Sequence, residues 1–182
     1  SLGLVALSVM APIESFSLSV VIGLSSAAGV LIGNELGAKN YDSTYLKAKS
    51  VMIFNMLVSV VLALILYGFQ VQVLGLFPVL TGDAQELAKK FIIVLCLGIV
   101  LRSIPMMAIT GILRAGGDVK FCLYQDLIAQ WLITIPIAAL AAIYLDFQPE
   151  WIFLIFLLGE FLKCFSSVLR IKSKQWIKQI IN

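Results

Sequence analysis

The chain has 182 residues, of which 61% are hydrophobic and only 13% are charged, and its formal net charge at pH 7 is +3. This charged share is about half that of an ordinary soluble domain, and the cations are spread between apolar runs, which disfavours nucleic acid as a partner. The sequence has no histidine and its three cysteines form no CxxC pair, so neither a metal centre nor a disulfide framework is expected.

Five long apolar runs follow one another and predict an all-α, polytopic membrane helix bundle. A bilayer core about 30 Å thick needs roughly 20 apolar residues in a helix, and the runs lack the alternation typical of barrel strands. The expected transmembrane bundle covers residues 1–170, with spans at residues 3–33, 50–77, 90–113, 121–145 and 150–169. Residues 171–182 are predicted to form a cytoplasmic amphipathic tail, either as a short helix on the inner leaflet or as a frayed, solvated segment.

The distribution of lysine and arginine predicts the orientation. The loops after the first and third spans and the tail are rich in these residues, whereas residues 146–150 contain none. The positive-inside rule therefore places the carboxyl terminus in the cytoplasm and Ser1 outside, as expected of a multi-pass cell-membrane protein. With five spans and no initiator methionine, we expect a carboxyl-terminal piece of a larger protein; a whole five-span protein trimmed at its start is the alternative.

Two local signals mark helix starts. Thr81-Gly-Asp83 followed by Glu86 is typical of an N-cap with its capping partner. Gln148-Pro149-Glu150 places a proline at a first helical position and an acid in the first turn.

A glycine motif closes the first span. In Gly29-Val-Leu-Ile-Gly33-Asn-Glu-Leu-Gly37 the three glycines lie four residues apart, on one helix face, and Ser25 extends the row by one turn. Small residues at this spacing allow helices to approach closely in lipid. We therefore expect tight helix packing here in preference to a ligand site.

A second motif closes the third span. Gly111-Ile-Leu-Arg114-Ala-Gly-Gly117-Asp118 predicts a tight turn in which Asp118 caps the next helix and Arg114 is a cytoplasmic anchor. A phosphate-cradling role is a weak alternative, because the spacing matches no nucleotide-binding loop.

Together these motifs resemble the carboxyl-terminal half of the multidrug and toxic compound extrusion (MATE) family. GVLIGNELGAKN and GILRAGGD are similar to stretches that follow helices eight and ten in that family, so the chain would correspond to helices eight to twelve of twelve. The resemblance implies two six-helix bundles around a central cavity and export of cationic or amphipathic organic compounds against Na⁺ or H⁺. It also implies the small organic substrate, the lipid bilayer and the missing amino-terminal lobe as partners.

One position departs from the family pattern. Many members place an acid in the tenth helix, eleven residues before the arginine of the second motif, and this position is Ser103 here. A tyrosine found four residues earlier in some members is Ile99. Ser103 remains a candidate site residue by position, but the cation site of those members cannot be transferred. Other members use an aspartate of the first helix, which this chain does not include.

Charged residues inside the membrane are the strongest site signal. Arg102 lies about 18 Å along its helix from Lys90, and Glu160 lies about 15 Å from Glu150, so both are near one depth. We predict that Arg102 and Glu160 pair, with Lys163 competing for Glu160 one turn away. Gln130 and Trp131 are expected in the same layer. The group could be a polar cavity floor that binds substrate or responds to protons, or a structural ion pair.

The remaining intramembrane polar groups have weaker assignments. Glu14, beside Pro12, is predicted near the outer mouth of the first span, as a cation ligand or an ordinary interfacial acid. Asp126 is expected to face water or a nearby cation such as Lys120, and Asn55 is expected to hydrogen-bond between helices.

These observations favour a secondary-active multidrug efflux antiporter that needs no cofactor beyond the coupling ion. The sequence contains no Walker loop, and it lacks the histidine and nucleophile elbow expected of a membrane enzyme. The alternatives are a flippase of related fold for lipid-linked oligosaccharides and a non-catalytic membrane scaffold subunit.

Overall fold

The computed structural model describes residues 2–76, 83–144 and 149–178, and every regular element in these ranges is helical, as the sequence predicts. The elements, with η for a π-helix, are α1 (Leu2–Gly37), α2 (Tyr41–Gly68), α3 (Gln70–Gly75), α4 (Asp83–Met106), η1 (Met107–Leu113), α5 (Val119–Asp126), η2 (Leu127–Thr134), α6 (Ile135–Tyr144), α7 (Pro149–Lys172) and α8 (Gln175–Lys178). Pro149 is the first residue of α7, as expected, whereas Thr81 of the predicted N-cap lies outside the described residues.

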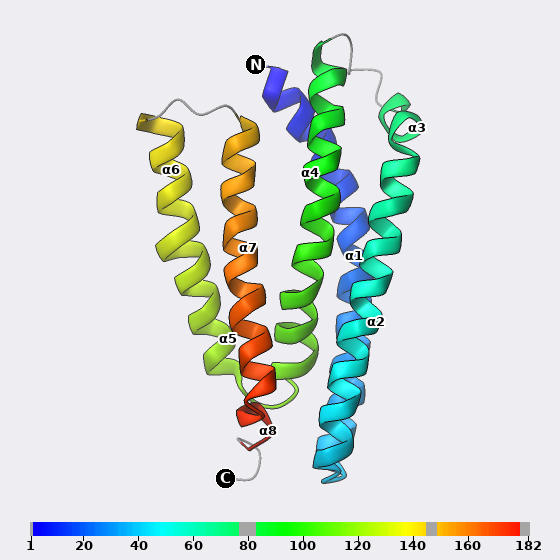
Figure 1. The fold of residues 1–182 in the computed structure, drawn as a ribbon, viewed down its shortest axis with the longest axis vertical. Helices are drawn as coiled ribbons and strands as arrows, with labels where there is room; N and C mark the ends of the chain where they lie inside the picture. Colours follow the sequence, from blue (N-terminus) through cyan, green and yellow to red (C-terminus); the bar gives the residue numbers. More distant parts are fainter. Residues whose placement is uncertain (1, 77–82, 145–148, 179–182) are drawn as a thin grey trace.

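Among the residues that the structure describes, four helical stretches are long and apolar enough to cross a bilayer, namely Ser8–Gly37, Tyr41–Gly68, Ala88–Leu113 and Val119–Tyr144. They correspond to the first four predicted spans. The fifth prediction falls on α7, which has 24 residues and runs alongside the others (Figure 1). Three charged residues of α7, Glu160, Lys163 and Arg170, form ion pairs with other parts of the bundle.

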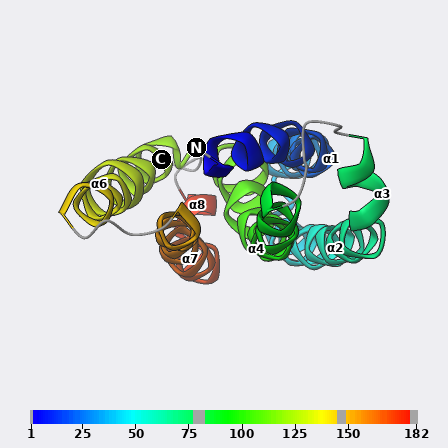
Figure 2. The same ribbon diagram turned by 90° about the horizontal axis from the view of Figure 1, so that it is seen from above.

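The continuous α4–η1 helix is the centre of the arrangement. It packs against α1, α2 and α7, while η2 and α6 pack on the far side of α7 (Figure 2). A side chain on α4 can therefore meet partners from three other helices, whereas one on α6 has access mainly to α7. This arrangement places the candidate site on α4.

The predicted close packing at the glycines of α1 is found at Gly29, where α1 lies against Gly111 of η1. A β-carbon added at Gly111 of η1 would lie 2.8 Å from the carbonyl oxygen of Ser25, and one at Gly29 would lie 3.5 Å from the carbonyl oxygen of Gly111. At Gly33 and Gly37, an added β-carbon would meet nothing within 4 Å among the described residues, so no close helix contact forms at these two glycines in the described part of the chain. The reason is helical periodicity: the buried stripe continues through three other side chains, Ala28, Ile32 and Leu36.

The turn after η1 is formed as expected, but Asp118 has a different role. Gly117 has φ 80°, which favours glycine, and Asp118 occupies the N-cap position of α5. The Asp118 carboxylate makes no capping hydrogen bond, so the predicted side-chain cap is wrong. Instead it accepts a hydrogen bond from Nε of Arg170 at 2.5 Å, because α7 passes beside the turn. Arg114 is exposed at the same turn.

The tail also differs from its prediction. The chain reverses at Lys174, whose φ is 55°, and α8 buries Trp176 and Ile177 in a cluster with Ile112 of η1. Nε1 of Trp176 donates to the carbonyl oxygen of Ile171 at 3.2 Å. The apolar face expected on the inner leaflet is therefore covered by the protein itself over the described part of the tail.

Candidate functional site

A cavity of about 170 Å³ opens between α4, η1, α5 and α7. We call it the polar cavity, because more than half of its lining side chains are charged. The lining residues are Arg102, Pro105, Met106, Ile109, Thr110, Arg114, Asp126, Glu160 and Lys163. The cavity lies where the central helix changes from α-helical to π-helical turns after Pro105. A proline has no N–H to donate, and π-helical turns are frequent at functional sites.

Arg102 connects three helices at this cavity. Its Nη1 atom forms an ion pair with Oε1 of Glu14 on α1, and its Nε atom lies 3.7 Å from Oε1 of Glu160 on α7. The predicted pairing of Arg102 with Glu160 is thus confirmed. Nε of Arg102 is buried and has no hydrogen-bond partner among the described residues, so the contact with Glu160 is one of charge without a hydrogen bond.

The predicted depth of Glu14, near the outer mouth, is wrong. Glu14 reaches Arg102, well down the central helix. The prediction counted residues from Asn34 and assumed that all connections on the inner side lie at one depth. Figure 1 shows instead that the connection between α1 and α2 lies well beyond the connection between α4 and α5. The cation bound by Glu14 in this structure is the guanidinium of Arg102.

Lys163 extends the charged group along α7 toward α5 and η2. Its Nζ atom lies 3.3 Å from Oδ1 of Asp126, 3.8 Å from Oε1 of Glu160 and 3.4 Å from Oε1 of Gln130. The predicted competition for Glu160 is confirmed, and Gln130 belongs to the layer in which it was expected. Asp126 pairs with a nearby cation, as expected, and this cation is Lys163 of α7 in place of the suggested Lys120.

We call the five charged side chains joined by these ion pairs the charge network: Glu14, Arg102, Asp126, Glu160 and Lys163. Three carboxylates and two cations leave the network with one uncompensated negative charge when all are ionised. An arginine or aspartate at a membrane helix centre costs roughly 2.5–3.5 kcal/mol on insertion scales, and mutual pairing lowers this cost.

Sequence reasoning missed the residue that supports Lys163. Nε2 of Gln125, on α5, donates to the carbonyl oxygen of Lys163 at 2.8 Å and to Oγ of Ser167 at 2.7 Å. The side chains of Gln125 and Ser167 are both buried. An intramembrane glutamine opposite a serine was the available signal, since such groups hydrogen-bond across membrane helices.

Comparison with known proteins decides the family. Residues 1–140 match the family model MatE. The chain belongs to the MATE family. It is 26% identical over 170 residues to the uncharacterized transporter YisQ of Bacillus subtilis, covering 92% of this chain and 36% of that protein. It is 30% identical over 138 residues to the probable multidrug resistance protein NorM of Bacillus cereus, with coverages of 74% and 30%.

A plant relative matches along the whole chain. Protein DETOXIFICATION 41 of Arabidopsis thaliana is 25% identical over 184 residues, which cover 100% of this chain and 36% of the relative. The chain therefore spans about one third of the length of these MATE relatives. The resemblance deduced from the two glycine motifs is confirmed.

Two candidate residues lie away from the polar cavity. Ser103, at the position where many MATE proteins have an acid, is fully buried between α4 and α2. Its carbonyl oxygen accepts from Nδ2 of Asn55 at 2.8 Å, and its hydroxyl accepts from Oγ of Ser59 at 3.0 Å. The predicted interhelical hydrogen bond of Asn55 is thereby confirmed. Trp131 is 65% exposed and does not line the polar cavity.

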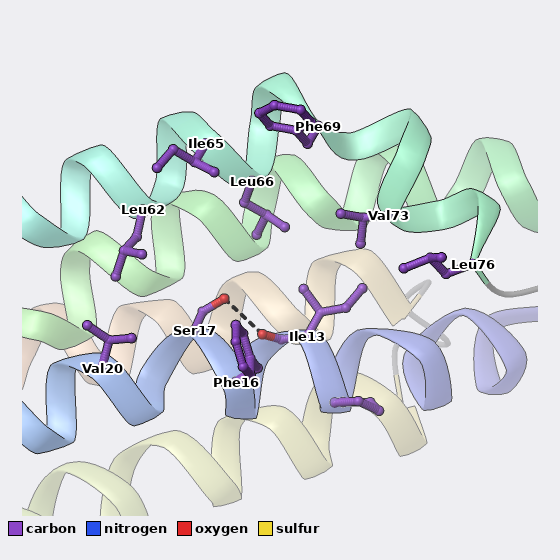
Figure 3. A pocket seen from close by; sticks show the side chains of 11 residues that line it. Ile13, Phe16, Ser17, Val20, Leu62, Ile65, Leu66, Phe69, Val73 and Leu76 are labelled. Carbon is purple, nitrogen blue, oxygen red and sulfur yellow. Dashed lines mark hydrogen bonds between the residues drawn. The ribbon is translucent and has the colours of Figure 1, made fainter.

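A larger cavity, of about 550 Å³, is apolar (Figure 3). Its lining comes from α1, α2 and α3 and contains no charged side chain: Pro12, Ile13, Phe16, Ser17, Val20, Leu62, Ile65, Leu66, Phe69, Val73 and Leu76. The one hydroxyl, of Ser17, donates to the carbonyl oxygen of Ile13 on its own helix at 2.8 Å. This surface can contact apolar groups, but it offers nothing to orient a charged one.

Proposed function

We propose that the protein containing this chain is a secondary-active multidrug efflux antiporter, which exports cationic or amphipathic organic compounds in exchange for Na⁺ or H⁺. Membership of the MATE family supports transport, and the NorM relatives carry the words "probable multidrug resistance protein" in their names. The observation on which the proposal rests is the charge network, which links four helices through ionisable groups beside a cavity.

The mechanism that this geometry supports is a competition for the carboxylates. Arg102 on the central helix holds Glu14 on α1 and lies beside Glu160 on α7. When a proton or cation neutralises one carboxylate, its attraction for Arg102 falls, and the helix that carries it is free to move. A cationic substrate competes for the same negative charge, so ion and substrate would each favour a different conformation.

Within this chain, we favour a proton over Na⁺ as the ion that the charge network accepts. A proton needs one carboxylate oxygen, whereas a metal cation needs several oxygen ligands around one point.

The driving force is adequate for export without ATP. One elementary charge moving through 100 mV supplies about 2.3 kcal/mol. Since each factor of ten in concentration requires about 1.4 kcal/mol, one charge sustains a gradient of roughly 50-fold.

The test is transport by the full-length protein in proteoliposomes under an imposed pH or Na⁺ gradient. We expect Arg102→Ala and Glu160→Gln to abolish or strongly reduce efflux of a cationic dye while still inserting. Lys89→Gln, which changes an exposed lysine near the start of α4, is the matched control and should transport normally. Normal efflux by both site variants would refute the role of the network, and no efflux by the wild type under either gradient would favour a scaffold.

A flippase for lipid-linked oligosaccharides is the second candidate. Three cations, Arg102, Arg114 and Lys163, line the polar cavity, and such a lining suits an anionic headgroup. Movement of a fluorescent lipid-linked sugar between leaflets, without dye efflux, would favour this alternative.

A further inference from the structure

A cleft between α2 and α7 lies at the end of the bundle that holds the connection between α1 and α2. Its volume is about 220 Å³, and its lining combines three polar with four apolar side chains: Tyr45, Lys49, Lys172, Met52, Ile53, Val168 and Ile171. We propose that this cleft binds an anionic phospholipid. The inference is independent of the exported compound and of the coupling ion.

The polar and apolar residues of the cleft are ordered along the membrane normal. α2 runs away from this end of the bundle and α7 runs toward it (Figure 1). Met52 and Ile53 therefore lie about one turn deeper than Lys49, and Val168 lies about one turn deeper than Lys172. Both walls thus present a cation at the surface and hydrocarbon below it, which is the polarity of a phospholipid with its headgroup outward.

The two lysines of the cleft carry charges that no described residue neutralises in an ion pair. Lys47 is paired with Glu35 at 2.6 Å, and Arg170 is paired with Asp118 at 2.5 Å. Lys49 and Lys172 are exposed and form no ion pair within 4.0 Å with any described residue. They are therefore available to a phosphate group.

A third lysine stands at the mouth of the cleft. Nζ of Lys174 lies 4.5 Å from the centre of the Tyr45 ring, and Tyr45 lines the cleft. Lys174 lies in the turn that follows α7, where its φ is 55°. The turn thereby adds cationic charge at the level where a headgroup would lie.

The apolar walls distinguish a lipid from a free phosphate ion. Ile53 is half exposed, and Leu46, Met56 and Leu169 extend the exposed apolar surface on both helices around the cleft. A phosphate ion would use the lysines and leave this surface uncovered, whereas an acyl chain covers it. Basic pockets between membrane helices on the cytoplasmic side are known to bind acidic headgroups, and the lysine and arginine distribution predicts that this end is cytoplasmic.

The experiment is native mass spectrometry of the full-length protein in detergent, titrated with phosphatidylglycerol or with phosphatidylcholine of the same chains. We expect the wild type to retain phosphatidylglycerol more tightly. From the usual contribution of a basic residue at an anionic surface, Lys49→Gln with Lys172→Gln should weaken this binding about 30-fold. The control pair, Lys89→Gln with Lys90→Gln, removes two exposed lysines near the start of α4, which begins at the end of the bundle opposite the connection between α1 and α2 (Figure 1), and should bind like the wild type.

A second variant tests the apolar half of the cleft. Ile53→Trp fills the apolar part of the cleft and keeps both lysines, so it should weaken phosphatidylglycerol binding. In the wild type, inorganic phosphate should not displace the bound lipid. The proposal is overturned if the double variant Lys49→Gln with Lys172→Gln binds phosphatidylglycerol as tightly as the wild type. It is also overturned if the control variant Lys89→Gln with Lys90→Gln loses as much affinity as that double variant. Displacement of the lipid by equimolar phosphate would likewise overturn it, in favour of a simple anion site.

Discussion

Nε of Arg170, near the end of α7, lies 2.5 Å from Oδ2 of Asp118 in the turn between η1 and α5. The Asp118 side chain is 1% exposed, and the Arg170 guanidinium also stacks over the ring of Phe121, 5.0 Å from its centre. The ion pair fastens the central helix to α7 at the end of the bundle opposite the amino terminus. It therefore supports the packing that brings Glu160 and Lys163 to the polar cavity.

We expect Asp118→Ala to destabilise the protein by about 3 kcal/mol. Removing one member of a buried pair leaves an uncompensated charge, which costs about 3–5 kcal/mol, and the partial exposure of Arg170 places the value at the low end. The measurement is thermal unfolding of the purified full-length protein in detergent. Lys120→Gln, an exposed change two residues away, should leave the melting temperature unaltered. Equal melting temperatures for both variants would show that the pair contributes nothing.

Gly111→Ala and Gly33→Ala should have opposite effects. The new β-carbon at Gly111 would meet the Ser25 carbonyl oxygen at 2.8 Å, and backbone cannot easily move away, so we expect a loss of about 1–3 kcal/mol. At Gly33 the same change meets nothing within 4 Å among the described residues and removes a flexible helical glycine, so stability should be unchanged or rise by up to about 1 kcal/mol. Denaturation of the two variants side by side checks this; similar losses in both would restore Gly33 as a packing residue.

Trp176→Ala should release the tail from the bundle. Trp176 is fully buried, and truncation of a buried tryptophan costs about 3–5 kcal/mol. Limited proteolysis should cut after Lys172 or Lys174 faster in the variant than in the wild type. Trp131→Ala, which removes an exposed tryptophan, is the control and should be cut at the wild-type rate. An unchanged rate for Trp176→Ala would indicate that the tail does not dock.

Glu14 and Arg102 should be energetically coupled. Because the two side chains form an ion pair, Glu14→Gln should lower the free energy of unfolding more in the wild-type protein than in a protein that already carries Arg102→Gln. We expect a coupling free energy of 0.5–3 kcal/mol, the range for residues in direct contact. A double-mutant cycle in detergent measures it, and strictly additive losses would contradict the contact. A cycle between Glu14 and the distant Lys89 is the control.

Some features of the site could be predicted because they depend on position along a helix. Arg102 and Glu160 were placed at one depth by counting residues from the ends of their spans, and the structure has them 3.7 Å apart. The same counting failed for Glu14, because α1 and α2 extend beyond the turn between η1 and α5. The roles of Asp118 and Trp176 could not be predicted either, since each depends on where α7 and α8 pass.

The helical, membrane-spanning character of this chain follows from hydropathy alone, because a bilayer demands apolar length and internally satisfied backbone hydrogen bonds. These are one-dimensional requirements that can be read residue by residue. Which polar groups meet depends on the rotation and relative height of each helix, and these are set by contacts between residues far apart in the chain. The pairing of Arg102 with Glu14, of Lys163 with Asp126 and of Arg170 with Asp118 was accordingly decided by packing.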